Sequence, residues 1–597
     1  MPADFSDRRD FENSEKGFIA TLEPLVVKGA DGRIVWDMDW GFLEEDCPDT
    51  ANPSLWRQAQ LTAIHGLYEV TDGIYQVRGF DMSNMTLVEG SEGVIVIDPL
   101  ISVECAAAAL ALYRANRGER PVTAVIYTHA HIDHFGGVLG VVEADTSVPI
   151  IAPKHFLEHA VSENVYAGNA MIRRSYYYSA MNSPKGPAGN LGIGLGAGGS
   201  SGTVSLLAPT LDITHTGQEE VIDGVRIVFQ MTPGTECPAE MNFYFPDKRA
   251  LCMAENATHN MHNILTLRGA QVRDPRIWSR YLAEAVELFA EKSDVSFASH
   301  HWPTWGTDAI VEYLTAQRDL YAYLHDQTLR LLNEGFVGSE IAETLELPPT
   351  LESSWHTHGY YGSTNHNVKA IYQRYLGWYD GNPAHLWPHP PEAAGTRYVK
   401  VIGGIEATLA RAQEFIDEDD LRFAAELASH AVFAEPTNAA AKDLLAGVLE
   451  RLAYGSEAAT WRNCFLTGAY ELRNEVQHSN LNSAGVAPAL TTTQLFDSIA
   501  IRVNGPRAWG EALSINWIVT DEDTRYRMEL SNGALVHFPS NVDRKADATV
   551  TLTRTQLLGL LLAGNTDGVS IEGDAAVLGK VVALTETPDP DFAIVLP

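Results

Sequence analysis

The stretch Thr128–Gly137 reads THAHIDHFGG and directly follows the apolar run Val122–Tyr127, VTAVIY. A β-branched run of this length is typical of a buried strand. The polar cluster then lies on the loop at the carboxyl edge of that strand, where open α/β sheets bind ligands. His129 and His131 alternate in this loop, so both side chains can face the same way. Such alternation suits two imidazoles that bind one divalent ion.

Two further ligand-type residues, Asp133 and His134, follow just past the turn and can reach a second ion close to the first. A lone histidine near a strand is more often a hydrogen-bonded core residue than a ligand. Four ligand-type residues in the pattern H-x-H-x-D-H argue against that reading. The spacing therefore predicts a site for two metal ions.

The composition excludes several classes of protein. The chain has 597 residues, a formal net charge of -35 and a pI near 4.9. Its length predicts about three to four domains. Its charge argues against nucleic-acid binding, because phosphate would be repelled across most of the surface. The five scattered cysteines argue against a disulfide framework and favour a reducing compartment.

The N-terminal segment, MPADFSDRRDFENSEKG, lacks the apolar core of a secretory signal, and no uninterrupted apolar stretch approaches the length of a membrane span. We therefore expect a cytoplasmic protein without membrane insertion. A periplasmic or secreted location is the alternative, for the case that an export signal has been removed from this sequence. Residues 1–65 are polar with little periodicity, and we expect them to form an arm packed on the surface.

Short strands and one helix precede the metal loop. From Ile74 to Asp98 the sequence holds IYQVRG, MTLVEG and GVIVID, which are β-branched runs separated by Gly-containing turns. Cys105–Asn116 is Ala-rich and helical in pattern. This order of elements predicts one half of an α/β sandwich. Asp98 ends a strand and has two readings: it holds the metal loop from behind, or it is a simple strand-end cap.

Carboxylates follow two later strands. After the strand Val221–Met231, TPGTECPAEMNFYF places Glu236 on a turn, and ALCMAEN places Glu255 at the end of the next apolar run. Carboxylates at this edge of the sheet suit a two-metal site, one as a terminal ligand and one as a bridge. Glu240 competes with Glu236, and the sequence alone separates them weakly.

The last candidate ligand, His300, follows the short strand Val295–Ala298, with His301 as its alternative. The interval from His155 to Pro209 does not fit a compact sheet, since a helical part is followed by a flexible Gly-rich loop. Arg173 and Arg174 in this interval could attract an anion to a cap over the metals. The alternative is an ordinary helical insertion with solvated arginines.

The C-terminal half changes in character. Ala309–Leu345 is helical, and Ile405–Arg473 forms consecutive amphipathic helices with a tetratricopeptide-like pair. His478–Ala489 is a linker in composition. The helical and β-branched runs beyond it predict a small α+β domain with an apolar face, which either takes up alkyl chains or is an ordinary core.

Five segments resemble one family: THAHIDHFGG, TPGTECPAEMNFYFPDKRALCMAEN, LTLRGAQVRD, ASHHWPTWG and NHNVKAIYQRYLGWYDGNP. They resemble the alkylsulfatases of the metallo-β-lactamase superfamily, over essentially the whole chain. Most superfamily members carry a third histidine and an aspartate where this chain has Glu236 and Glu255. The resemblance implies an αββα sandwich, then an all-α dimerisation domain, then a sterol carrier protein-like α+β domain. We place these at residues 66–308, 309–477 and 478–597, after the arm 1–65.

The resemblance also implies roles for single residues. Its two zinc ions per chain are bound by a set of seven ligands, with Glu255 as the bridge: His129, His131 and Glu236 for one ion, and Asp133, His134 and His300 for the other. Arg268 binds sulfate, and we take Asp133, Glu255 and His262 as catalytic. His259 and His262 either donate a proton or are structural. Iron or manganese could occupy the same ligands.

The expected activity is zinc-dependent hydrolysis of amphiphilic sulfate esters, such as dodecyl sulfate, to an alcohol and inorganic sulfate by a dizinc-activated hydroxide, in a homodimer. Two alternatives remain at this stage. One is a superfamily hydrolase of another ester or thioester. The other is a lipid-binding protein with a merely structural metal, against which seven ligands argue, because a structural zinc normally has four.

Overall fold

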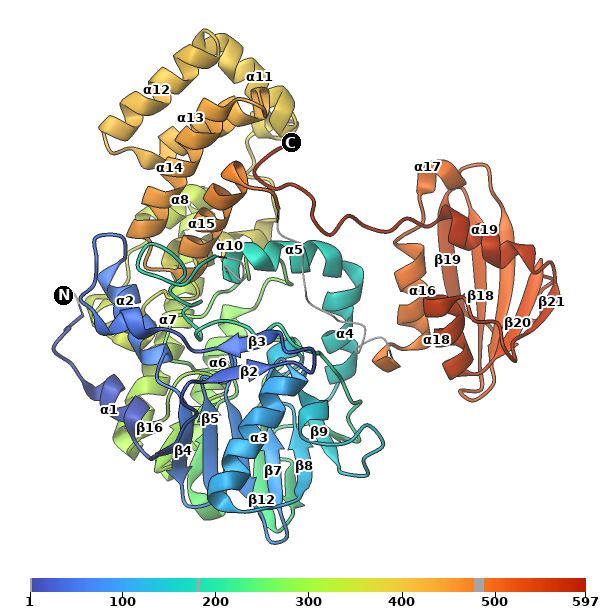
Figure 1. The fold of residues 1–597 in the computed structure, drawn as a ribbon, viewed down its shortest axis with the longest axis horizontal. Helices are drawn as coiled ribbons and strands as arrows, with labels where there is room; N and C mark the ends of the chain where they lie inside the picture. The colour runs from blue at the N-terminus through green and yellow to red at the C-terminus, as the bar shows by residue number, and fades with distance from the viewer. Residues whose placement is uncertain (1–2, 180–182, 477–487) are drawn as a thin grey trace. The chain divides into compact units, whose positions relative to one another are not determined.

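The computed structural model describes residues 3–179, 183–476 and 488–597. The chain forms two compact units (Figure 1). The first comprises Met1–His159, Met171–Asn482 and Asp591–Pro597, and the second comprises Ala160–Ala170 and Ser483–Pro590. The predicted linker His478–Ala489 lies largely outside the described residues.

The first unit contains an eight-stranded sheet in the order β1-β4-β5-β6-β7-β8-β9-β10. Helix α3 (Val103–Arg117) connects β7 to the parallel strand β8 and packs on this sheet, where Tyr113 contacts Tyr75 with ring centroids 5.8 Å apart. The strands are β1 (Phe18–Ala20), β4 (Gly66–Thr71), β5 (Ile74–Arg78), β6 (Met85–Glu89), β7 (Val94–Ile97), β8 (Val122–Ile126), β9 (Ile150–Pro153) and β10 (Leu211–Ile213).

A six-stranded sheet faces the first one, in the order β11-β12-β13-β14-β15-β16. Apolar side chains of both sheets, among them Ile95, Ile126, Phe229 and Phe243, form the core between them. Helix α6 (Pro275–Leu288) covers the other face through Trp278. The αββα sandwich is thus confirmed. The strands are β11 (Glu219–Ile222), β12 (Val225–Met231), β13 (Met241–Phe245), β14 (Ala250–Cys252), β15 (Val295–Phe297) and β16 (Thr304–Trp305).

The N-terminal 65 residues contain more regular structure than their composition indicates. Strand β1 pairs with β4 at the edge of the first sheet. The segment also contains α1 (Arg9–Glu15), β2 (Val26–Lys28), β3 (Ile34–Asp37) and α2 (Pro53–Thr62). Leu55 and Trp56 of α2 are buried, so this segment contributes to the core.

The interval before β10 begins with helices α4 (Phe156–Tyr166) and α5 (Gly168–Ser179), as the sequence predicts. The Gly-rich loop that follows was expected to be flexible, and this expectation is wrong for part of it. Ile193 and Leu195 are buried in an apolar cluster with Tyr178 and Tyr361.

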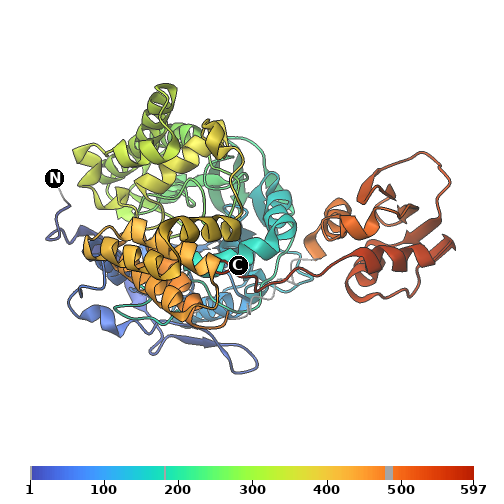
Figure 2. The same ribbon diagram turned by 90° about the horizontal axis from the view of Figure 1, so that it is seen from above.

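Helices complete the first unit. The long helix α7 (Thr307–Asn333) shares one apolar core with α6 and α10 (Thr364–Leu376), so this core continues across residue 308. A separate group of helices, seen clearly from above in Figure 2, packs through small residues such as Ala428 and Ala431. Val595 and Leu596 of the C-terminal tail pack against this group. Its members are α11 (Pro391–Ile402), α12 (Ile405–Asp417), α13 (Leu421–Ala434), α14 (Ala439–Gly455) and α15 (Ala459–Arg473).

The shorter helices of this unit lie between these elements. They are α8 (Gly338–Thr344) and α9 (Pro349–Glu352), with the 3-10 turns η1 (Gly41–Glu44), η2 (Ile132–His134), η3 (Val138–Gly140), η4 (Pro246–Lys248), η5 (Ala290–Lys292), η6 (Trp355–Thr357) and η7 (Pro383–His385). Turn η2 holds part of the histidine motif, directly after β8.

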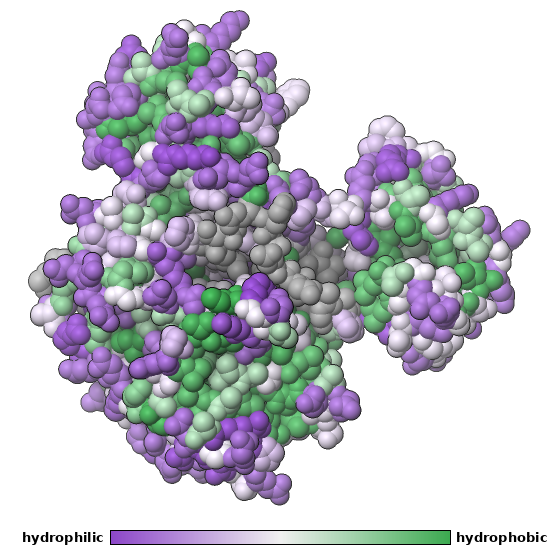
Figure 3. All heavy atoms as spheres, viewed as in Figure 1, coloured by the Kyte–Doolittle hydropathy of each residue, from purple (hydrophilic) through white to green (hydrophobic). Residues whose placement is uncertain are grey.

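The second unit is the predicted α+β fold, with a five-stranded sheet in the order β19-β18-β17-β20-β21. Buried and half-buried residues alternate along β17 (Leu513–Val519), so one face of the sheet packs on helices. Apolar side chains also reach its surface (Figure 3), including Leu562 and Val582. The other elements are α16 (Thr492–Ala500), α17 (Gly505–Ala508), β18 (Thr524–Ser531), β19 (Ala534–Pro539), β20 (Ala548–Leu552), α18 (Arg554–Ala563), β21 (Ser570–Gly573) and α19 (Ala576–Leu584).

None of the helices in the described part of the chain combines the length and the apolar character that a membrane span requires.

Candidate metal centre

The predicted ligands meet at one edge of the two facing sheets. The histidine motif follows β8, Glu236 precedes β13, Glu255 follows β14, and His300 follows β15. The structure brings together all seven residues in two groups that share Glu255, and the ligand atoms of each group lie within 4.8 Å of one another. The groups are His129, His131, Glu236 and Glu255, and Asp133, His134, Glu255 and His300.

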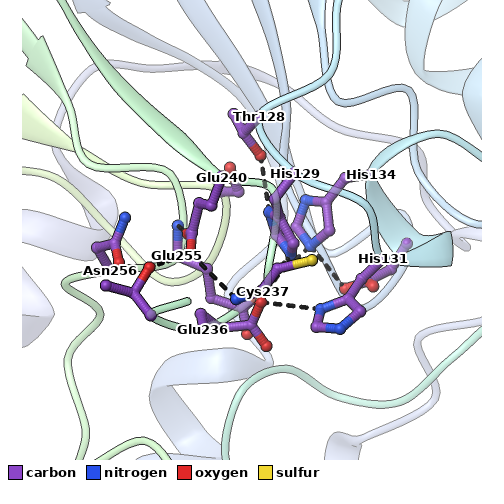
Figure 4. A network of polar contacts seen from close by, with 12 residues as sticks. Thr128, His129, His131, His134, Glu236, Cys237, Glu240, Glu255 and Asn256 are labelled. Atoms are coloured by element: carbon purple, nitrogen blue, oxygen red, sulfur yellow. Dashed lines mark hydrogen bonds and ion pairs between the residues drawn. The ribbon is translucent and has the colours of Figure 1, made fainter. Parts of the chain in front are cut away.

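The first group converges on carboxylate oxygens (Figure 4). Glu236 Oε2 lies 2.8 Å from His131 Nδ1 and 3.1 Å from His129 Nε2. His129 Nε2 also lies 3.2 Å from Glu255 Oε2. One imidazole therefore faces both glutamates.

The second group uses the same oxygen of Glu255. Its Oε2 lies 3.2 Å from His134 Nε2 and 3.2 Å from His300 Nε2. Asp133 Oδ2 lies 3.0 Å from His134 Nε2 and 3.4 Å from His300 Nε2. A single carboxylate oxygen thus faces three imidazoles of the two groups.

The residues present fit divalent metal ions. His129 Nε2, His134 Nε2, His300 Nε2 and Glu236 Oε2 are buried and have no hydrogen-bond partner. Buried polar atoms are rarely left without partners, so four of them at one place suit the binding of cations. Imidazole and carboxylate ligands suit zinc, and also iron or manganese.

The electrostatics of the group support this reading. Burial alone would lower the pKa of the His129 imidazole, but Glu236 and Glu255 outweigh burial and raise it to about 10. Against the same effect of burial, Glu255 and Asp133 raise the pKa of His300 to about 9. The carboxylates therefore stabilise positive charge between the two ligand groups, carried either by protons on the imidazoles or by metal ions.

Asp98 holds the metal loop from behind, which is the first of its two readings. It accepts hydrogen bonds from the Thr128 backbone N–H at 2.8 Å and from the Thr128 hydroxyl at 2.7 Å. Its Oδ2 lies 2.9 Å from His134 Nδ1 and accepts from the Ser299 hydroxyl at 2.6 Å. These contacts orient the His134 ring.

The two competing candidates, Glu240 and His301, lie outside both groups. Glu240 accepts a hydrogen bond from the Thr235 hydroxyl at 2.8 Å and from the Glu255 N–H at 3.3 Å. His301 has a left-handed backbone with a φ of 62°, and its Nδ1 accepts from the His259 N–H at 2.9 Å. Both residues support neighbouring loops.

The two histidines after Glu255 differ in their surroundings. His262 Nε2 lies 2.8 Å from Glu255 Oε1, whereas the other oxygen of Glu255 faces the imidazoles of the two ligand groups. His259 stacks between Trp302 and Tyr313, with ring centroids 4.7 and 4.8 Å away. Burial lowers the pKa of His259 to about 3. His259 is therefore packed as a structural residue, whereas His262 contacts Glu255, the residue that both ligand groups share.

The three arginines that were expected to attract an anion or bind sulfate differ in burial and in their contacts. Arg268 is half-buried, and its guanidinium partly counters the burial that raises the pKa of the Tyr178 phenol. Arg174 is exposed and donates to the Leu267 carbonyl at 2.8 Å. Arg173 is buried in an ion pair of 2.8 Å with Glu471, so it fits neither alternative, the anion-attracting arginine or the solvated one.

Sequence reasoning missed Arg273. Its guanidinium is buried, donates to the Glu236 carbonyl at 2.5 Å and pairs with Glu236 Oε1. It lies within the segment LTLRGAQVRD, directly before the N-cap residue Asp274 of α6. No local pattern distinguishes it from a solvated arginine.

Three family models match successive parts of the chain. They are the metallo-beta-lactamase superfamily over residues 78–300, alkyl sulfatase dimerisation over 337–475 and alkyl sulfatase C-terminal over 480–597.

Similar proteins extend over the full length. A linear primary-alkylsulfatase of Pseudomonas sp. is 48% identical over 99% of this chain and 90% of its own, and an alkyl/aryl-sulfatase of Saccharomyces cerevisiae is 46% identical over 99% and 94%. The solved structure of a stereoselective inverting sec-alkylsulfatase from Pseudomonas sp. is 42% identical and matches with a TM-score of 0.96 over 100% of this chain and 96% of that one. The chain therefore belongs to the alkylsulfatase family of the metallo-β-lactamase superfamily.

Proposed function

We propose that this protein is a zinc-dependent alkylsulfatase with two zinc ions per chain. It hydrolyses primary or secondary alkyl sulfate esters, such as dodecyl sulfate, to an alcohol and inorganic sulfate. The observation that carries the proposal is Glu255 Oε2, which lies 3.2 Å from an imidazole nitrogen of each of His129, His134 and His300. The names of the full-length relatives supply the substrate class.

The seven ligands described above would hold the ions. When bound, two divalent ions supply a water molecule of lowered pKa and positive charge for the sulfate oxygens. Among the protein's own groups, Asp133 and Glu255 would orient that water. His262 holds or moves a proton at Glu255 Oε1, 2.8 Å away. Arg268 offers a permanent positive charge to the sulfate group.

We propose that the alkyl chain of the substrate lies beside Arg268, near the apolar side chain of Leu267. Leu267 packs against the cluster that contains Tyr178, Ile193 and Tyr361. Each methylene of the alkyl chain that the protein buries would contribute about 0.8 kcal/mol. A charged head at Arg268 and an apolar tail near Leu267 would match the two parts of an amphiphilic sulfate ester.

The test measures sulfate release from dodecyl sulfate and from a secondary alkyl sulfate. The bound metals are counted before chelation, after chelation and after zinc return. We expect release that requires about two zinc ions per chain and that fails in His131→Ala and Glu255→Ala. His155→Ala, at an exposed histidine, is the matched control and retains activity. Absence of release despite two bound zinc ions would overturn the substrate class, and release after complete chelation would overturn the metal dependence.

We also propose that the protein is a homodimer. The match to alkyl sulfatase dimerisation over residues 337–475 supports this. Within that range, Trp378 is 75% exposed and Trp387 is 95% exposed. Large aromatic side chains left open to this extent are typical of an interface. We therefore take a second copy of this chain as the partner, in line with the dimerisation that the family match describes.

The predicted domain boundaries and location remain proposals. The arm 1–65 and the domains 66–308, 309–477 and 478–597 agree approximately with the ranges of the three family matches. None of the five cysteines, all of which lie in the described ranges, forms a disulfide, which supports the proposed cytoplasmic location.

A further inference from the structure

The side chain of Arg273 is enclosed by the metal centre. It is 6% exposed, and its Nη1 donates to the Asn263 carbonyl at 2.8 Å and lies 3.2 Å from His262 Nδ1. Its other donors go to Glu236, through the backbone carbonyl and through Oε1. An arginine keeps its proton in proteins, so this guanidinium is a permanent buried charge.

The two oxygens of Glu236 serve different partners. Oε2 faces His131 and His129 and has no hydrogen-bond partner, whereas Oε1 is paired with Arg273. The outer oxygen of Glu255 differs, because it faces the imidazole of His262. Among the described residues, Glu236 is the one carboxylate of the two ligand groups with an arginine ion pair.

We propose that Arg273 neutralises Glu236, so that this residue binds its metal ion as a ligand with almost no net charge, equivalent to an imidazole. Two carboxylates, Asp133 and Glu255, then contribute the negative charge of the ligand set. The loaded centre keeps more positive charge for an anionic sulfate ester than three unpaired carboxylates would leave. Arg273 is thus a positioning and charge-balancing residue. The inference rests on the proposed metal site and not on the substrate.

The pairing can be tested with substitutions that change charge at nearly constant size. Arg273→Lys keeps the positive charge, and Arg273→Gln removes it while keeping a hydrogen-bond donor for the Asn263 carbonyl. Each is made alone and combined with Glu236→His, which supplies a neutral ligand directly. Thermal unfolding of the full-length variants in the presence of chelator, and Zn2+ affinity by competition with a chromophoric chelator, are then measured.

We expect the order of the two substitutions to reverse. With Glu236 present, Arg273→Gln unfolds at a lower temperature than Arg273→Lys, because the buried carboxylate loses its counter-charge. With Glu236→His, Arg273→Lys is the less stable, because a buried cation has no partner. The affinity for Zn2+ should also depend on the unpaired cation in the Glu236→His background. Glu236→His alone should bind Zn2+ at least tenfold more weakly than Glu236→His combined with Arg273→Gln.

The same order of stability in both backgrounds would overturn the proposal, since it would mean that Arg273 only fills space or holds Asn263. Equal Zn2+ affinity of Glu236→His with and without Arg273→Gln would also overturn it. If the Arg273→Gln variants do not fold, Glu236→Gln alone is compared with Glu236→Gln combined with Arg273→Met. The proposal then requires the combination with Arg273→Met to be the more stable. None of these measurements uses a sulfate ester, so a wrong substrate class would not affect them.

Discussion

Two buried glutamates on one turn, Glu236 and Glu240, have different contacts, and this difference predicts different effects of the same substitution. Glu236→Gln should lose bound metal and reduce sulfate release at least about 100-fold, because its Oε2 faces His131 and His129. Glu240→Gln should keep both metals and lose at most about tenfold, because its hydrogen bonds hold a loop. Metal content and activity of the purified variants decide this. Equal losses would place Glu240 among the ligands.

Asp81 gives a pH prediction away from the ligands. Burial raises its pKa to about 6, although it accepts hydrogen bonds from Ser200 and from the Met82 N–H. Because the folded pKa lies above the unfolded value of 3.8, the folded state binds the proton more tightly. Asp81 therefore lowers stability as pH rises from about 4 to about 6, by about 3 kcal/mol, and has no further effect above that range.

Asp81→Asn removes this titration. The free energy of unfolding of the natural protein, relative to that of the variant, should fall between pH 4 and pH 6 and then stay level. Denaturant titrations of the full-length protein at several pH values measure it. A constant difference over this range would contradict the raised pKa.

At this scale the sequence predicts a ligand well when its neighbours in the chain are also ligands. His129, His131, Asp133 and His134 follow from spacing along one loop. His300 and His301 could not be separated, because the left-handed backbone of His301, with a φ of 62°, turns its side chain away. Arg273 could not be predicted, because its partner Glu236 lies 37 positions earlier.

The metal loop, as an element, lies directly on the backbone behind it. A Cβ on Gly136 would lie 2.2 Å from the Ile101 carbonyl oxygen and 2.8 Å from that of Ile132. Backbone atoms cannot yield cheaply, so Gly136→Ala should displace the loop, cost roughly 1–3 kcal/mol of stability and reduce bound metal.

Gly447→Ala in helix α14 is the matched control, because no atom lies within 4 Å of its added Cβ. It should leave the metal content unchanged and raise stability by about 0.5–1 kcal/mol. Unfolding temperature and metal content of both variants are the measurements. Full metal content in Gly136→Ala would show that the loop tolerates the shift.

Elements with strong local patterns were predicted well, and those fixed by distant contacts were not. The strands between Ile74 and Asp98 and helix α3 lie where the β-branched and Ala-rich runs indicate. The Gly-rich composition predicts a flexible loop, but Ile193 and Leu195 of this loop are buried in a cluster with Tyr361. Tyr361 is distant in the sequence, so a local pattern does not indicate this contact. Strand β1 was missed, because it exists only by pairing with β4.

At the scale of the whole molecule, the proposed dimer can be tested at its exposed aromatic residues. Replacing Trp378 and Trp387 together by serine should shift the protein from dimer to monomer, because aromatic anchors contribute most of the free energy of such interfaces. Light scattering after size-exclusion chromatography measures the mass. Trp509→Ser in the second unit, at a residue 71% exposed, is the control and should not change it. A dimer that survives the double substitution would move the interface elsewhere.

The C-terminal tail changes how the second unit can be removed. Residues 591–597 belong to the first unit, where Val595 and Leu596 pack on its helices and the Phe592 carbonyl accepts from Arg173 at 2.9 Å. The chain crosses between the units at four places, after residues 159, 170, 482 and 590. A truncation at residue 480 would therefore also remove the tail that packs on the first unit. A single proteolytic cut between the units would separate neither unit from the other, because other chain segments still connect them. An excision of residues 483–590 that rejoins the tail through a flexible linker removes the second unit except for Ala160–Ala170 and keeps the tail in the first unit.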